Sequence, residues 1–174
     1  SDRVSAAATP RQTLREATLS DRVMSALPLA TVYIWLSGLY AVEAWRRVTP
    51  WLFTDELQFT QLARSIAATG HPARRGQSYS AGSIYSYVTA PFWRIDDVAK
   101  AYDAIKYFDV LVMTSVVFPT YFLARLLVGR KAALLAAAGA AVLPSLAYSS
   151  YIVDETFAYP WAALCFFLIA QALV

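Results

Sequence analysis

The stretch Val23–Trp45, VMSALPLATVYIWLSGLYAVEAW, decides the fold class of this chain. As an α-helix it would rise about 34 Å, which exceeds the roughly 30 Å hydrocarbon core of a bilayer. Glu43 is its only charged residue and lies near its end, where water is within reach. Pro28 falls in the first turns, where a missing backbone N–H costs little. We therefore expect this stretch to cross a membrane.

Three more apolar stretches follow, at 107–128, 132–148 and 157–174. Pro119 is expected to kink the first of them, and Asp109 near its start is expected to reach water. The second is rich in alanine, which predicts close packing against neighbouring helices. Hydrophobic residues make up 58% of the chain and charged residues 16%, against roughly 25% charged in soluble domains. The sequence predicts an all-α polytopic membrane protein with about four transmembrane helices.

The chain divides into a polar tail at 1–22 and a membrane module at 23–174, which we expect to be incomplete. The loop at 46–106 is too polar to span a membrane. Part of it predicts an amphipathic surface helix that ends at Gly70, because apolar residues recur there at helical spacing: Phe59, Leu62, Ala63 and Ile66. The apolar segment 84–93 is too short to cross and predicts an interfacial or re-entrant element.

The charges of the short loops predict the orientation. Basic residues in the tail and in the turn at 125–131 indicate that both are cytoplasmic. The loops that carry Asp55 and Asp154 would then face outward, so we expect a plasma or inner membrane protein with its functional face outside. The net charge of +3 gives no reason to expect a nucleic-acid partner, and the lone Cys165 excludes a disulfide scaffold.

Two acidic pairs fall in separate outer loops and can converge on one cavity: Asp55-Glu56 and Asp154-Glu155. Such carboxylates can take a proton from a substrate hydroxyl, bind Mg²⁺ or Mn²⁺ through oxygen, or simply be solvated. We favour Asp55 as the catalytic base, with Glu56 beside it, because the dipole at the start of a helix favours an ionised carboxylate. Asp154 and Glu155 would orient the substrate that carries this hydroxyl, or would join Asp55 as metal ligands.

A lipid phosphate at the outer surface would need one or two cations, since Arg pairs bidentately with phosphate. The candidates are Arg64, Arg74, Arg75 and Lys106. For any one of them, a charge that simply faces the lipid headgroups is the plain alternative. His71 is the only histidine, so a His-rich metal site is excluded.

Several short motifs follow one another in a recognisable order. They are TDELQFTQLAR at 54–64, YSYVTAPFW at 85–93, YFLARLLVG at 121–129, the Ala-rich stretch ending near Pro144, and the acidic loop after it. Their order resembles the N-terminal portion of the GT-C membrane glycosyltransferases, which include the protein O-mannosyltransferase and aminoarabinose transferase types.

This resemblance implies an inverting sugar transfer from a polyprenyl-phosphate donor to an acceptor hydroxyl on the outer membrane face, with or without a metal ion. Asp55 corresponds to the acid of the family's first outer loop. Some members carry Lys-Pro-Pro before the short aromatic segment, whereas this chain has Gly82-Ser83-Ile84-Tyr85 and no lysine. The implied partners are membrane lipid, the lipid-linked sugar, a saccharide or protein acceptor, and the rest of the chain or a partner subunit.

Two other functions compete with the transferase. A non-catalytic assembly subunit would use its small-residue helix faces to dock partner helices. A transporter subunit would use its acids as an ion or proton site, but such sites prefer the bilayer midplane. The acidic pairs lie in loops and at the ends of spans, which argues against transport.

Overall fold

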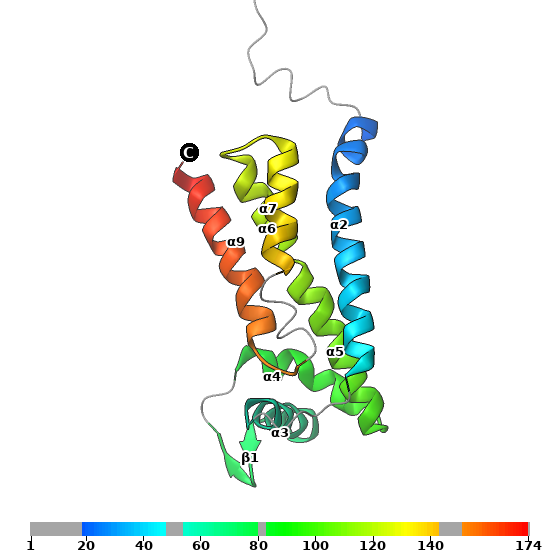
Figure 1. The fold of residues 1–174 in the computed structure, drawn as a ribbon. Coiled ribbons are helices and arrows are strands. Elements are labelled where there is room, and N and C mark those ends of the chain that lie inside the picture. Colours follow the sequence, from blue (N-terminus) through cyan, green and yellow to red (C-terminus); the bar gives the residue numbers. More distant parts are fainter. Residues whose placement is uncertain (1–18, 48–53, 80–82, 143–150, 174) are drawn as a thin grey trace, which may run out of the picture.

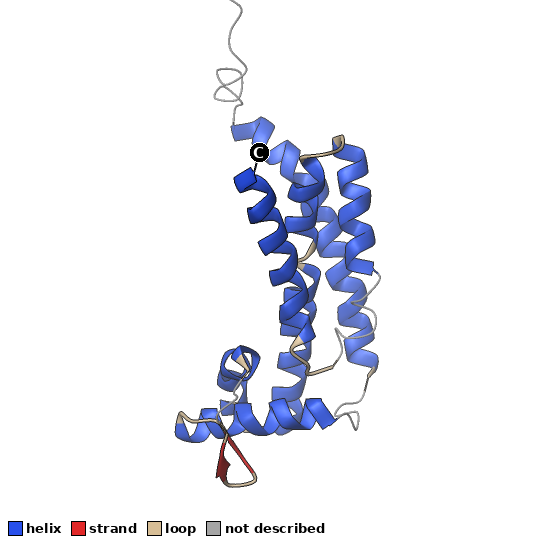
Figure 2. Cartoon of the chain, turned by 90° about the vertical axis from the view of Figure 1, so that its left-hand side faces the viewer, coloured by secondary structure: helices blue, strands red, loops and turns tan. Residues whose placement is uncertain are grey.

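The computed structural model describes residues 19–47, 54–79, 83–142 and 151–173. Its elements, in chain order, are α2 (Leu19–Arg46), α3 (Thr54–Thr69), β1 (Ala73–Arg74), β2 (Gln77–Ser78), α4 (Ile84–Thr89), η1 (Ala90–Arg94), α5 (Val98–Thr114), α6 (Val117–Arg125), α7 (Arg130–Val142) and α9 (Glu155–Leu173). In Figure 1, α2, α5, α6, α7 and α9 run along one long axis, and α3 and α4 lie across one end. The side view in Figure 2 shows the same layer of crossing helices, with the hairpin beyond it.

Three helical stretches are long and apolar enough to cross a membrane: Ala26–Arg46, Val98–Arg125 and Glu155–Leu173. The described residues are mostly helical and include one antiparallel hairpin, in which Ala73 pairs with Ser78. An all-α membrane protein agrees with both findings. The further span predicted at 132–148 is described only as far as Val142, where α7 ends, and its remainder lies outside the described residues.

The second span begins earlier than the apolar pattern predicts. It starts at Val98 rather than at position 107, because the polar residues before 107 belong to the same helix. Asp97 caps that helix by accepting hydrogen bonds from the backbone N–H groups of Ala99 at 2.9 Å and Lys100 at 3.3 Å. An Asp at this position satisfies N–H groups that have no partner within the helix. The long helix therefore continues from the loop predicted at 46–106 directly into the bundle.

A break between α5 and α6 falls at Ser115 and Val116, one turn before Pro119. Proline has no N–H, so the Ser115 carbonyl loses its partner four residues on. That carbonyl accepts from the Phe118 N–H at 3.0 Å instead, which tightens the turn. The helix is thus interrupted where Pro119 is expected to disturb it, at the residue whose carbonyl has lost its usual helical partner.

Alanines allow α7 to pack closely in the bundle. Ala133, Ala137 and Ala141 are fully buried at every fourth position, which places them on one helix face. Their small side chains let two tyrosine hydroxyls reach the α7 backbone: Tyr40 donates to the Ala141 carbonyl and Tyr159 to that of Ala140, each at 2.9 Å. The packing predicted from the alanine-rich sequence is confirmed for this helix.

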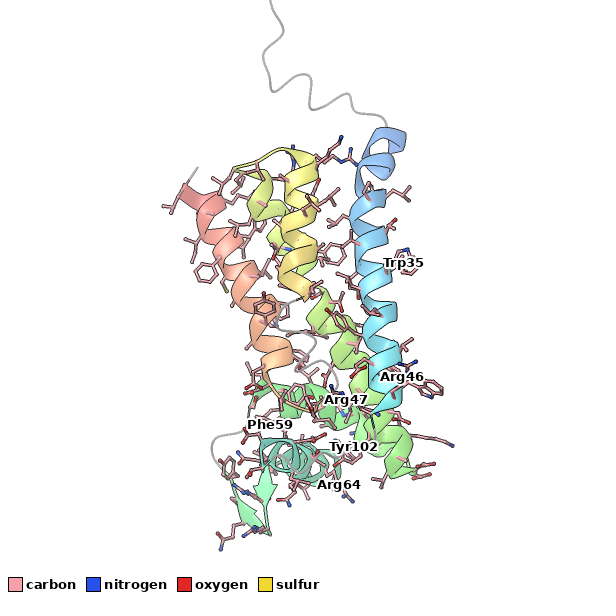
Figure 3. All side chains as sticks on the ribbon, in the orientation of Figure 1. Trp35, Arg46, Arg47, Phe59, Arg64 and Tyr102 are labelled. Carbon is pink, nitrogen blue, oxygen red and sulfur yellow. The ribbon has the colours of Figure 1, made fainter. Side chains whose placement is uncertain are left out.

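Large apolar side chains cover the outside of the bundle. Trp35 on α2 is 76% exposed and projects away from the other helices in Figure 3. Leu135 on α7 and Phe166 on α9 are also largely exposed. In water such a surface would be unfavourable, whereas in a bilayer it contacts lipid chains.

The layer across the end of the bundle starts with α3. This helix contacts α4, η1 and β1, and the residues that it buries are Glu56, Thr60, Leu62 and Ala63. It ends before Gly70, whose φ of 79° suits a residue without a side chain. The amphipathic helix predicted here is present, and its buried face packs on α4 and η1.

Candidate functional site

Two adjoining grooves follow α9 from its polar end into the bundle. The first has a volume of about 440 Å³ and is lined by Ser83, Ile84, Tyr85, Val88, Asp154, Phe157, Ala158 and Trp161. The second has about 430 Å³ and is lined by Val112, Ser115, Phe118, Pro119, Phe157, Pro160, Trp161 and Leu164. They share Phe157 and Trp161 in their linings and therefore lie next to each other, and we call the two together the α9 groove. Its polar end carries Asp154, and its deeper half is lined by residues of two candidate membrane spans.

Tyr85 connects this groove to the interior of the protein. Its hydroxyl donates to Asp109 Oδ2 at 2.6 Å, and both side chains are almost fully buried. The Tyr85 ring packs edge-on against Phe59 of α3 and Phe157 of α9. One tyrosine of α4 thus contacts α3, α5 and α9, which are the elements that meet at this end of the bundle.

Three carboxylates act on Tyr85. Burial raises the pKa of this phenol well above its ordinary value of 10, and the negative charge of Asp109 raises it further. The charges of Glu56, from α3, and of Asp154, from the start of the last helix, add in the same direction. Tyr85 therefore stays protonated and keeps its hydrogen for Asp109. The charges of Glu56 and Asp154, which come from two separate segments, therefore both act on this one residue.

The two residues of the first acidic pair lie in different environments. Glu56 is fully buried, whereas Asp55 at the start of α3 is exposed. In the second pair, Asp154 is half-buried and lines the α9 groove, and Glu155 is exposed and lines neither part of it. Of the four acids, Glu56 and Asp154 are thus the two that are withdrawn from solvent, and their charges both act on Tyr85.

The proposed metal ligands do not form a ligand set. Within the described ranges, no three His, Cys, Asp or Glu side chains are grouped so that they could hold a metal ion. Asp55, Asp154 and Glu155, the ligands expected from the sequence, are therefore not gathered into such a group among the described residues. No step below is assigned to a metal.

The predicted phosphate-binding cations are spread over the crossing layer. Arg64 is exposed, with its guanidinium 5.6 Å from the Trp93 ring centroid. Arg74 donates to Gln58 Oε1 at 3.0 Å, and Arg75 occupies the hairpin turn with a φ of 53°. None of these three lines the α9 groove. In Figure 3, Arg64, Phe59 and Tyr102 lie together at the lower end of the molecule.

Lys106 holds helices together. Its ammonium group is buried, donates to the carbonyls of Ala44 at 3.2 Å and Arg47 at 3.1 Å, and pairs with Asp103 at 2.8 Å. Those carbonyls belong to the end of α2, where a cation also complements the helix dipole. Lys106 therefore attaches α5 to α2, and the donors that a phosphate would need are already used.

Sequence reasoning missed two pairs of side chains. Asp109 was expected to reach water, but it is fully buried against Tyr85; a lone charge in an apolar stretch was the signal for it. Arg47 donates to Glu43 Oε1 at 2.8 Å and also to the Tyr151 hydroxyl. The hydrogen bond to Glu43 raises the pKa of Arg47 above its ordinary value. The hydrogen bond from Arg47 to Tyr151 joins the end of α2 to the segment that leads into Asp154, and no local sequence pattern reveals this long-range contact.

Comparison of the chain with protein-family models, with curated proteins and with solved structures finds no match. The functional argument therefore rests on the geometry of this site and on the order of motifs in the sequence.

Proposed function

We propose that this chain is a membrane glycosyltransferase of the GT-C type, or the N-terminal part of one. It would move a sugar from a polyprenyl-phosphate donor to an acceptor hydroxyl at the outer membrane surface. One observation supports the proposal: Asp154 and Tyr85 line the polar end of the α9 groove, and the charges of Asp154 and of Glu56, from a second segment, both act on Tyr85. A reaction between a lipid-borne substrate and a hydroxyl needs a site where polar groups and an apolar groove meet.

The chemistry requires a base that substrate can reach. A hydroxyl is a weak nucleophile near neutral pH, and a positioned carboxylate that accepts its proton contributes about 10²- to 10⁴-fold in rate. Asp55 is exposed at the first turn of α3, next in sequence to the buried Glu56. We assign the base to Asp55, because Glu56 is enclosed by protein. Asp154, half-buried in the groove, would hold the acceptor hydroxyl by accepting a hydrogen bond.

A transfer assay tests the proposal. Full-length protein in nanodiscs would be given a radiolabelled polyprenyl-phosphate sugar and a panel of hydroxyl acceptors. We expect Asp55→Asn to lower the transfer rate by about 10²- to 10⁴-fold. Asp96→Asn, which removes an exposed carboxylate between η1 and α5, should leave the rate within twofold. If Asp55→Asn keeps most of its turnover, the base assignment is wrong. If no lipid-phosphate sugar supports transfer, the proposed function itself is wrong.

A further inference from the structure

The charges along the α9 groove restrict the lipids that it can hold. Of the residues that line either half in the described part of the chain, Asp154 is the charged one, and Ser83 and Ser115 supply hydroxyls. The charge of Glu56 acts on Tyr85 in the same direction as that of Asp154. A phosphate headgroup at this end would therefore meet like charge in a poorly solvated place, where repulsion is strong.

Cations that could reverse this balance are engaged elsewhere. Lys106 is bound to the end of α2, and Arg47 to Glu43 and Tyr151. Arg64 and Arg74 are in contact with residues of the crossing layer. The groove thus offers apolar walls with a hydrogen-bond acceptor at its mouth. Phosphate recognition typically uses a paired arginine, and no arginine or lysine is among the described residues that line this groove.

The size and position of the groove fit one hydrocarbon chain. Its two parts, about 440 and 430 Å³, together fall within the range of about 300–1,000 Å³ that is usual for ligand pockets. Phe157 and Trp161 form the shared wall, and Ile84 and Trp161 at its rim are largely exposed. Because Phe157 and Trp161 belong to a candidate membrane span, a lipid chain would reach the groove directly from the bilayer.

We propose that the α9 groove binds the acceptor and that the acceptor is a membrane lipid: an uncharged glycolipid whose chain lies along Phe157 and Trp161 and whose hydroxyl donates to Asp154. The role of this lipid as acceptor rests on the proposed function, whereas the binding of a neutral lipid with a hydroxyl group does not. The donor phosphate would then approach from outside the groove, on the side of the arginines of the crossing layer.

Photo-crosslinking of full-length protein in nanodiscs tests the proposal. Three probes would carry the same diazirine alkyl chain and differ in headgroup: a neutral glucoside, a phosphate and an amine. We expect the glucoside to label the peptide that contains residues 157–164 about tenfold more than the phosphate does, which corresponds to the repulsion of one like charge in a partly buried site.

Two helix variants separate the groove from general lipid contact. Ala158→Trp places a bulky ring in the groove, and Ala162→Trp adds the same ring one turn further along α9 at an exposed position outside it. We expect Ala158→Trp to lower glucoside labelling about tenfold and Ala162→Trp to leave it within twofold. Circular dichroism and gel filtration would verify that both variants are folded.

A charge variant tests the role of Asp154. Asp154→Asn keeps a hydrogen-bond acceptor but removes the charge, so glucoside labelling should change by less than about threefold while phosphate labelling rises about tenfold. Asp96→Asn is the matched control and should change neither.

Each other result overturns the inference. Equal labelling by all three probes would make the groove an ordinary lipid-facing surface. Stronger labelling by phosphate would make it the donor's groove, and stronger labelling by amine would make it a cation site. Absence of labelling in the full-length protein would mean that protein covers the groove. Labelling as expected without any sugar transfer would refute the proposed function and leave the lipid-binding site in place.

Discussion

The hydrogen bond between Tyr85 and Asp109 should contribute measurably to stability, and Tyr85→Phe tests this. The substitution removes one hydroxyl, keeps the ring that packs on Phe59 and Phe157, and leaves Asp109 Oδ2 without its donor. The other oxygen, Oδ1, has no hydrogen-bond partner among the described residues. Loss of this donor therefore leaves the whole carboxylate poorly satisfied in a fully buried place.

The size of the effect follows from burial and charge. Hydrogen bonds between helices in membranes contribute about 0.6 kcal/mol on average, but a buried polar group that is left without its partner costs about 1–3 kcal/mol. Since Asp109 is 0% exposed and Tyr85 1% exposed, no solvent replaces the lost donor, and the cost of an unsatisfied buried group applies. We expect Tyr85→Phe to lower the free energy of unfolding by about 2 kcal/mol.

Unfolding in mixed detergent micelles, with a denaturing detergent as titrant, measures this change. Tyr87→Phe is the matched control, because Tyr87 is on the same short helix but 48% exposed, and it should cost less than about 0.5 kcal/mol. In an Asp109→Leu background, Tyr85→Phe should also cost less than about 0.5 kcal/mol, since the carboxylate that needs the hydroxyl is gone. Equal losses in both backgrounds would refute the reasoning.

Three more predictions follow from the same structure. Lys106→Met should lower the free energy of unfolding by about 1–3 kcal/mol, because the carbonyls of Ala44 and Arg47 lose the ammonium group that donates to them. Asp103→Asn changes a partner that is 56% exposed, so in the same detergent titration it should cost less than about 1 kcal/mol. Because burial raises the pKa of Tyr85, the folded state binds its proton more tightly than the unfolded state. Its contribution to stability is complete below pH 10 and is lost as the pH rises through the raised pKa, so the unfolding midpoint above pH 10 should fall more steeply in the parent protein than in Tyr85→Phe. With Cys165 replaced by alanine, Gln77→Cys on the exposed hairpin should react with an impermeant maleimide in intact cells, and labelling only after permeabilisation would invert the predicted topology.

The membrane-spanning elements were predictable because a bilayer imposes length and composition on each of them. The apolar stretch at 23–45 predicts a spanning helix, and it lies within α2. The alanine-rich sequence of α7 predicts its close packing against neighbouring helices. The start of α5 was not predictable in this way, because Asp97 caps a helix whose first turns are polar and lie in the crossing layer. Hydropathy identifies the part of a helix in lipid and does not mark where the helix begins.

The candidate site was only partly accessible to sequence reasoning. The pattern predicted that acids of two loops would converge, but it could not decide which residue of the first pair is buried. That choice depends on how α3 is rotated against α4 and η1. The pairing of Tyr85 with Asp109 joins a segment read as interfacial to a span, and the contact of Arg47 with Tyr151 joins residues far apart in the chain. Such tertiary contacts leave no periodic signal in a single sequence.

The distribution of charge at this end of the molecule separates two kinds of substrate. Negative groups surround Tyr85 and the mouth of the α9 groove, whereas the arginines of α3 and the hairpin belong to the crossing layer. A phosphate-bearing donor is attracted to cations and repelled by carboxylates, and a neutral hydroxyl needs only an acceptor. If sugar transfer takes place here, the two substrates must therefore approach from different sides, the acceptor along the groove and the donor over the crossing layer. Asp55, exposed at the start of α3, belongs to the crossing layer. A base acts on the acceptor hydroxyl alone, so transfer through Asp55 requires the acceptor hydroxyl to reach this layer, where the donor phosphate also arrives.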